Sequence, residues 1–162
     1  MYDTNQVHYL VVTGILVRDG KYLLVKRASW EKAFPGKWSV PGGKVKVLDY
    51  ALRKKDTSEH WYYVLEDSLR REVKEETSLD ILNIGYVVSM VYVRPDSIPC
   101  LIVSLYADAP VGEIHLNSAL EEHAWVTLEE AKEYDLIEGI YDELVMLDTF
   151  LKTGKHMIWK KS

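Results

Sequence analysis

Three glutamates in the middle of the chain have the spacing best suited to chemistry. Glu72, Glu75 and Glu76 stand at positions i, i+3 and i+4, which become neighbours on the surface of a helix. Carboxylates this close repel one another, and partial burial of any of them adds a cost unless it is paired. Arg71, four residues before Glu75, can offset one charge, and a divalent cation can offset the rest. Because carboxylate oxygens are hard donors, the expected ion is Mg²⁺ or Mn²⁺.

A helix carrying these glutamates would turn two of them inward. On a helical wheel, Leu65 and Leu69 begin an apolar stripe. Glu72 and Glu76 continue that stripe where further leucines would be expected. A Glu-x-x-Glu-Glu pattern is most often a solvated helix face, and this segment alone leaves that interpretation open. The inward placement, together with a Pro-Gly-Gly turn upstream at the end of a strand, favours a metal site.

Six strands are predicted around this helix from runs of aliphatic and aromatic residues. Asp19-Gly20 has the sequence of a two-residue hairpin turn, and Pro95-Asp96-Ser97 turns a longer hairpin. Residues 29–37 read as a loop, and Pro41-Gly42-Gly43 stops a short strand. The predicted strands are His8–Val17, Tyr22–Val25, Trp38–Val40, Ile81–Arg94, Pro99–Ala107 and His123–Val126.

Helical patterns occur in three places. The first runs from Trp61 to about Thr77, and a capping box at Thr127–Glu130 starts a short helix. Residues 47–60 are charged and aperiodic and predict no clear element. Strands mixed with two principal helices suggest an α/β (α+β) protein whose sheet is covered on both faces. The last helix carries one apolar stripe, formed by Ile140, Leu144, Leu147 and Leu151.

Composition restricts the class of protein. The 162 residues suit one domain, spanning 1–162. A net charge of −5 argues against a nucleic-acid partner, which would call for a basic surface, but it allows a small phosphorylated substrate. With a single cysteine, Cys100, no internal disulfide can form. No run of residues is long and apolar enough for a membrane partner, and Met1–Gln6 does not open a signal peptide. We therefore expect a cytoplasmic protein.

Two segments together resemble the Nudix box, Gly-x5-Glu-x7-Arg-Glu-(apolar)-x-Glu-Glu-x-Gly-(apolar). Arg71–Leu79 is similar to its second half, and Trp38–Lys44 looks like the segment that opens it. Leu23–Arg27 and Trp125–Glu130 also resemble family positions. The similarity extends from about residue 11 to residue 131 in the right order. It implies an α/β/α sandwich with a central mixed β-sheet.

The chain departs from this pattern at three points. Gly43 and Arg71 are 28 residues apart where the pattern has 14, which predicts an inserted loop at about 44–62. Counting back eight from Arg71 reaches Tyr63, where the pattern has Glu. Ser78 replaces the glycine that closes the helix, so it has to adopt a left-handed conformation or the helix has to end differently.

The resemblance implies a divalent-metal-dependent pyrophosphohydrolase. Its substrates contain a nucleoside diphosphate linked to another moiety: a nucleoside triphosphate, an oxidised nucleotide, or a nucleotide sugar such as ADP-ribose. Glu72, Glu75 and Glu76 would bind Mg²⁺ or Mn²⁺, and Arg71 would orient them. The proton acceptor would be a box glutamate such as Glu75 or an acidic residue on a later loop.

Further site residues follow from the same resemblance. Glu121 and Glu122 are the later acidic candidates for the proton acceptor, although either fits an ordinary surface charge equally well. Gly42 and Gly43 could approach the metal or phosphate closely because they lack side chains. Arg27 could reach a phosphate, and Trp61 could cover the base or sugar.

One alternative of a different class stays open. The same fold can serve as a catalytically impaired nucleotide-binding sensor or partner module, which Tyr63 and the insertion favour and the intact Arg-Glu-x-x-Glu-Glu core disfavours. The expected partner is a small nucleotide in either case. Because many relatives are dimers, a homodimer is a further expectation, without a surface assigned to it.

Overall fold

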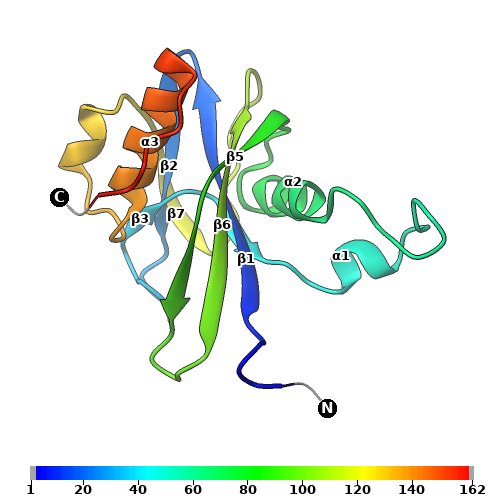
Figure 1. The fold of residues 1–162 in the computed structure, drawn as a ribbon. Helices are drawn as coiled ribbons and strands as arrows, with labels where there is room; N and C mark the ends of the chain where they lie inside the picture. The colour runs from blue at the N-terminus through cyan, green and yellow to red at the C-terminus, as the bar shows by residue number, and fades with distance from the viewer. Residues whose placement is uncertain (1–2, 161–162) are drawn as a thin grey trace.

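The computed structural model describes residues 3–160, which form one mixed sheet with helices beside it (Figure 1). None of the helices in this part of the chain is long and apolar enough to cross a membrane. The strands are β1 (Tyr9–Arg18), β2 (Lys21–Arg27), β3 (Trp38–Ser39), β4 (Gly42–Lys44), β5 (Leu82–Val93), β6 (Pro99–Asp108) and β7 (Leu120–Val126). The helices are α1 (Leu48–Ala51), α2 (Val64–Thr77), a 3-10 turn (Glu130–Glu133) and α3 (Ile140–Thr153).

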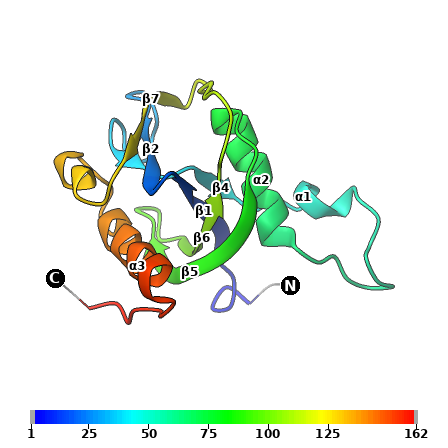
Figure 2. The same ribbon diagram turned by 90° about the horizontal axis from the view of Figure 1, so that it is seen from above.

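The sheet has the strand order β3-β2-β1-β6-β5, with β4 paired to β1 and β7 paired to β2. Strands β1 and β6 are parallel, and the other pairs are antiparallel. Figure 2 shows α2 and α3 on opposite faces of this sheet. The predicted α/β/α sandwich with a central mixed sheet is therefore confirmed.

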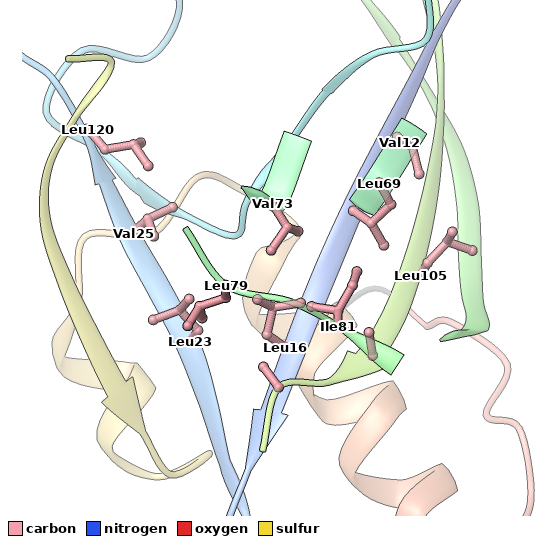
Figure 3. Packing of buried hydrophobic residues seen from close by; sticks show 12 residues of the cluster. Val12, Leu16, Leu23, Val25, Leu69, Val73, Leu79, Ile81, Leu105 and Leu120 are labelled. Atoms are coloured by element: carbon pink, nitrogen blue, oxygen red, sulfur yellow. The ribbon is translucent and has the colours of Figure 1, made fainter. Parts of the chain in front are cut away.

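Each helix has its own apolar core. Leu69 and Val73 of α2 pack with Val12 and Leu16 of β1 on one face (Figure 3). Leu144 of α3 belongs to the cluster on the other face. Successive residues of β1 point to opposite faces, because the side-chain period of a strand is two. The alternation along β1 therefore fixes which residues meet α2 and which meet α3.

Strands β1 and β2 separate soon after their hairpin turn. Asp19 and Gly20 have φ angles of 50° and 72°, as the predicted turn requires. Beyond that turn β4 takes the place beside β1, with Thr13 opposite Gly42. Strand β3 ends before Pro41-Gly42-Gly43 as predicted, and Gly42 then opens β4, a strand that the sequence analysis did not predict. A side chain is not tolerated there, because a Cβ on Gly42 would lie 2.4 Å from the Val12 carbonyl oxygen.

Several other boundaries differ from the sequence predictions. Helix α2 begins at Val64 rather than at Trp61, because Tyr63 is in a left-handed conformation with φ of 57°. Strand β7 begins at Leu120, earlier than predicted, and pairs with β2. Leu151 was wrongly assigned to the buried stripe of α3 and is 47% exposed.

The capping box forms as predicted but precedes only one 3-10 turn. The Thr127 amide donates to Glu130 Oε2 at 2.7 Å, and the Glu130 amide donates to Thr127 Oγ1 at 3.2 Å.

The segment between β4 and α2 extends beyond the N-terminal end of α2 (Figure 1). The sequence predicted no clear element for residues 47–60, but α1 forms there. Arg53 binds Asp56 Oδ2 at 2.8 Å, and the Trp61 indole donates to the Arg53 carbonyl at 3.0 Å. These contacts order the segment mainly from within.

Candidate active site

Helix α2 presents the carboxylates as the helical wheel predicted. Leu69 is fully buried, Glu72 is 9% exposed, and Glu76 is partly buried, whereas Glu75 is exposed. The helix ends at Thr77, and the capping residue Ser78 has φ of 66° and donates its amide to the Lys74 carbonyl at 3.0 Å. Ser78 thus adopts the left-handed conformation that the missing glycine would have supplied.

Glu72 is held between a glycine and an arginine. A Cβ added to Gly43 would lie 2.4 Å from the Glu72 carboxyl carbon, so the strand backbone reaches this carboxylate only because Gly43 has no side chain. Arg71 Nη2 lies 2.8 Å from Glu72 Oε1. The β4 strand and the helix therefore fix the position of Glu72.

Glu76 occupies a place where a negative charge is unfavourable. Burial raises its pKa to about 7, and the neighbouring Glu72 and Glu75 also raise it, against the lowering effects of the Gly42 amide and Arg27. The Gly42 amide donates to Glu76 Oε2 at 3.0 Å. A cation bound beside Glu76 would relieve both the burial cost and the repulsion.

Arg71 is anchored by an acidic residue that the sequence analysis missed. Its guanidinium binds Asp49 through Nε at 2.7 Å and Nη2 at 3.1 Å, and binds Glu75 through Nη1 at 3.1 Å. Asp49 also accepts hydrogen bonds from the Lys46 amide and the Ser68 hydroxyl, each at 2.9 Å. Although burial alone would raise the pKa of Asp49, these donors together lower it.

Asp49, rather than Tyr63, occupies the position of the box glutamate. Asp49 lies six residues after Gly43, which is the position of the glutamate in Gly-x5-Glu. Counting backward from Arg71 crossed the inserted residues and arrived at Tyr63, an exposed residue that precedes α2. The forward count was the signal that could have found Asp49. The additional residues therefore follow Asp49, at 50–63.

The carboxylates fit a hard divalent ion by donor chemistry but are engaged with protein donors. In residues 3–160, no three His, Cys, Asp or Glu side chains converge as a metal-binding group. Glu72 and Glu75 both turn toward Arg71, and Glu76 turns toward Gly42. The raised pKa of Glu76 and the all-oxygen donor set suit Mg²⁺ or Mn²⁺. Gathering the three around one ion requires side-chain rotation.

The end of β2 brings Arg27 to this site. Its positive charge acts on Glu76, while its side chain binds the Ala33 carbonyl at 2.6 Å and Glu31 at 3.3 Å. Glu121 accepts hydrogen bonds from the Ser29 amide and hydroxyl at 2.9 Å, which lower its pKa. Glu122 pairs with Lys26 at 2.6 Å. The two β7 glutamates thus bind Lys26 near the end of β2 and Ser29 just after it.

Trp61 lies within the insertion, away from the carboxylate end of α2. Its ring packs on Tyr50 at a centroid distance of 5.3 Å, and the Lys55 ammonium lies 5.1 Å from its ring. These neighbours, with the Arg53 carbonyl, belong to the inserted segment. The structure therefore does not bring Trp61 together with Gly42, Gly43 and the glutamates of α2.

Comparisons with known proteins agree with this architecture. A family model described as NUDIX domain matches residues 8–146. The nucleoside triphosphatase NudI of Klebsiella pneumoniae is 26% identical over 137 residues, covering 78% of this chain and 86% of the relative. NudI of Salmonella agona is 29% identical over 142 residues, with the same coverage of 78% and 86%.

Solved structures share the fold. The MutT protein of Methanosarcina mazei Go1 has a TM-score of 0.64 at 24% identity, covering 90% of this chain and 96% of that one. The NUDIX domain of Shewanella oneidensis NrtR, complexed with ADP ribose, has a TM-score of 0.70 at 18% identity, covering 93% and 94%.

The fold and these matches define the class of protein: a hydrolase that acts on the pyrophosphate bonds of nucleoside diphosphate derivatives. The chain belongs to the NUDIX domain family. Members of this family generally use a divalent metal.

Proposed function

We propose that this chain is a Mg²⁺- or Mn²⁺-dependent pyrophosphohydrolase that cleaves a nucleoside diphosphate linked to another moiety. The observation that carries the proposal is the placement of Glu72 and Glu76 on the inward face of α2, against Gly43 and Gly42. Nucleoside triphosphates are the first substrates to test, because the NudI relatives are named nucleoside triphosphatases. Oxidised nucleotides and nucleotide sugars such as ADP-ribose follow.

Glu72, Glu75 and Glu76 are the proposed metal ligands. All three come from the C-terminal half of α2, and burial, together with repulsion from Glu72 and Glu75, raises the pKa of Glu76. A bound divalent ion supplies positive charge to the phosphoryl oxygens and acidifies a coordinated water. Glu72 and Glu76 are already buried or partly buried at this end of α2, and the three carboxylates would rotate from their present donors to bind the ion.

Arg71 and Asp49 are positioning residues in this proposal. Arg71 contacts Glu72 and Glu75 from a single guanidinium. Asp49 holds that guanidinium through both of its carboxylate oxygens, and the Ser68 hydroxyl in turn holds Asp49. The Asp49–Arg71 pair therefore keeps two proposed metal ligands, Glu72 and Glu75, in place on the side of α2 near Gly43.

Glu75 is the proposed acceptor of the proton from the attacking water. Its side chain is 53% exposed and pairs only with Arg71 among the salt bridges of residues 3–160, so it can rotate toward a water. Glu121 is a weaker base because hydrogen bonds from Ser29 lower its pKa. Glu122 is paired with Lys26. We therefore assign the two β7 glutamates to holding β7 on β2.

The substrate phosphates would lie beside Gly42, Gly43 and Arg27. The glycine backbones let a phosphate approach without meeting a side chain. Arg27 already lies close enough to influence the pKa of Glu76, and a guanidinium pairs well with phosphate oxygens. Trp61 contacts the inserted segment instead of these groups, and we expect that segment to contribute to substrate preference.

The alternative is a nucleotide-binding module that has lost catalysis. Its support from Tyr63 falls away, because Asp49 supplies the carboxylate that pairs with Arg71. Its remaining support is the insertion and the likeness to a NUDIX domain that was solved with ADP ribose. Nucleotide binding without any cleavage would favour this alternative.

The test is a hydrolysis panel. The protein is incubated with Mg²⁺ or Mn²⁺ and with nucleoside triphosphates, ADP-ribose or dinucleoside polyphosphates, while phosphate and pyrophosphate release are followed. Glu76→Gln should lower turnover of the best substrate by about 100-fold or more. Glu66→Gln, on the same helix but off the inward stripe, should leave turnover unchanged. Equal rates for Glu76→Gln and the parent would refute the site.

A further inference from the structure

Strand β5 forms an open edge of the sheet. It is the last strand in the order β3-β2-β1-β6-β5 and is paired to β6 on its inner side. In residues 3–160, no backbone hydrogen bond joins its outer side to another segment. An open edge can pair with a further strand, and natural proteins usually shield it with charged residues, proline or a covering segment.

This edge lacks the usual shielding residues. The 12 residues of β5, Leu82–Val93, include neither a charged residue nor a proline. Irregularities in the register of β5 with β6 fall before Val88, and Val88–Val93 then pair without interruption. We call the outer side of Val88–Val93 the β5 edge. It is regular enough to accept another strand.

Two edges at the other end of the sheet are shielded. Strand β3 has only 2 residues, and its Trp38 amide donates to the Asp135 carbonyl at 2.9 Å, so a later segment covers it. Strand β7 carries the exposed carboxylates of Glu121 and Glu122. The β5 edge differs from both, because it is uncovered and uncharged.

The hydrogen bonds of the β5–β6 hairpin show which backbone groups point outward. The Arg94 amide donates to the Ile98 carbonyl at 3.1 Å, so these two residues form a hydrogen-bonded pair. Such pairs alternate with non-hydrogen-bonded pairs along an antiparallel ladder, and Pro99, opposite Val93, has no amide hydrogen. Val93 and every second residue before it, as far as Ser89, therefore direct their amide and carbonyl groups away from β6.

The side chains of the same residues form an exposed strip. Ser89 is opposite Val103, which packs against the core under α2, so Ser89, Val91 and Val93 lie on the α2 face of the sheet. Val91 is 54% exposed and Val93 is 58% exposed, and this end of the hairpin extends beyond α2 (Figure 1). Leu101, opposite Val91, is also exposed. The backbone groups and side chains of the β5 edge thus face solvent together.

A second copy of this chain matches the β5 edge in register. Antiparallel pairing about a twofold axis at Val91 places Val91 opposite the partner's Val91 and Ser89 opposite the partner's Val93. Because all of these residues direct backbone groups outward, each pair can exchange both of its hydrogen bonds. On the other face, Met90 comes opposite the partner's Tyr92, which allows a contact between a thioether and an aromatic ring.

Charge also favours a second copy as the occupant. Each chain has a net charge of −5, so two copies repel one another unless they meet at a neutral surface. The β5 edge is neutral, and in the twofold register Arg94 comes opposite the partner's Val88, away from the partner's Arg94. A strongly charged partner, by contrast, would find no charge to pair with along this edge.

We propose that two copies of this chain form a dimer by antiparallel pairing of their β5 edges, which joins their sheets side by side. This gives the expected homodimer a surface. The dimer does not depend on the proposed hydrolysis, because Val88–Val93 contains none of the proposed metal ligands. The paired segment is short, so we expect a reversible dimer with a dissociation constant of about 1–100 µM.

Sedimentation velocity at loading concentrations of about 1–300 µM measures this constant for the parent and for charge variants. Ser89→Lys/Val93→Lys places like charges opposite each other and should raise the dissociation constant about tenfold or more. Ser89→Lys/Val93→Glu places opposite charges there and should retain the dimer. Leu82→Lys is the matched control, because Leu82 is exposed but lies before the β5 edge, and it should keep the parental constant.

Three results would overturn the dimer as described. The first is a parent that stays monomeric at the highest concentration. The second is a parental dissociation constant in Ser89→Lys/Val93→Lys, which would mean that the copies associate through another surface. The third is equal weakening by both double variants, which would contradict the pairing of Ser89 with the partner's Val93.

Hydrogen exchange of the parent decides the case in which the charged variants do not fold. The Val91 amide has no backbone partner within residues 3–160, so it should exchange quickly in the monomer. Its exchange should slow about threefold or more between about 1 and 300 µM protein, while the amide of Val111, in an exposed loop, should not change. Fast exchange of Val91 at every concentration would overturn the dimer.

Discussion

At the scale of single residues, each buried acidic side chain near α2 is stable because a donor lies at a fixed position beside it. Asp49 accepts two hydrogen bonds from Arg71 and one from Ser68. Glu72 is paired with the same arginine. Arg71 is thus the residue through which changes at Asp49 reach the proposed metal ligands.

Replacing Asp49 by alanine should cost both stability and activity. The loss of a mostly buried partner leaves the Arg71 guanidinium only partly paired, at a cost of about 2–3 kcal/mol. Hydrolysis should fall about 10- to 100-fold, because residues that orient metal ligands have effects of this size. Chemical denaturation and steady-state kinetics measure the two losses.

Asp56→Ala is the control for this prediction. Asp56 is paired with Arg53 inside the insertion and is exposed, so its removal should change stability by less than about 0.5 kcal/mol. An Asp49→Ala protein as stable and as active as Asp56→Ala would mean that the Asp49–Arg71 pair does not organise the site.

Glu143 predicts a pH effect with a definite sign. Its pKa in the folded protein is about 7, raised by burial from an ordinary value of 4.5. The folded state therefore binds more protons than the unfolded state between these values, and stability from this group is lost as pH rises through the window. Glu143→Gln cannot titrate, so its free energy of unfolding should not fall with rising pH as that of the parent does.

The measurable quantity is the difference in unfolding free energy between Glu143→Gln and the parent. It should become more favourable to the variant by about 2–3 kcal/mol between pH 4.5 and pH 8. Urea unfolding at several pH values measures it. A difference that stays constant across this range would show that Glu143 does not titrate in the folded protein as its burial indicates.

The residue scale also shows what the sequence could and could not predict. The inward positions of Glu72 and Glu76 follow from helical periodicity alone, and both are buried or partly buried. Asp49 was missed because 21 residues separate it from Arg71 in the chain, and a contact over such a distance leaves no periodic pattern. The roles of Glu121, Glu122 and Arg27 stay predictions.

At the scale of elements, β4 and α2 fit together through the two glycines. Gly42 leaves room for β1, and Gly43 leaves room for the Glu72 carboxylate. The precision of the proposed site therefore depends on backbone contact rather than on side-chain packing alone.

Gly43→Ala should displace Glu72 and impair hydrolysis about 100-fold, because misplacing a ligand by about 1 Å is enough for a loss of this size. Gly85→Ala is a useful comparison, since its Cβ would meet the Tyr106 ring at the same 2.4 Å. That variant should lose stability and retain kcat once folded. Comparable kcat values for the two folded variants would argue against a role for Gly43 in placing Glu72.

The insertion should be dispensable for the fold. Deleting residues 50–63 restores the seven-residue spacing between Asp49 and Arg71, and the segment is mostly ordered by its own contacts. We expect the shortened protein to fold and to hydrolyse with a similar kcat, but with an altered KM or substrate preference. Circular dichroism and the same substrate panel test this, and an unfolded product would contradict it.

Elements with local signals were the predictable ones. The Asp19-Gly20 turn and the capping box depend on adjacent residues, and both form. Strand β4 depends instead on pairing with β1, which no local pattern indicates. The prediction that Leu151 lies on the buried stripe of α3 was wrong for a similar reason. Helical periodicity assigns a face to a helix, but it does not show where the sheet beneath that helix ends.

At the scale of the whole molecule, the divergence of β1 and β2 connects the parts of the site. Strand β4 enters beside β1, α2 covers one face, and α3 covers the other (Figures 1 and 2). The carboxylates of α2 and the residues of β1 that face α3 are then joined through the Thr13–Gly42 register. Composition and element order predicted the layers, but not this junction.

A metal titration tests the central claim most directly, namely that α2 directs its carboxylates toward one shared cation. Mn²⁺ binding is measured by calorimetry in the presence of a non-hydrolysable nucleotide, for the parent and for the double variant Glu72→Gln/Glu76→Gln. The account predicts saturable binding by the parent and at least about tenfold weaker binding by the variant. Equal affinity of the two proteins for Mn²⁺ would contradict it.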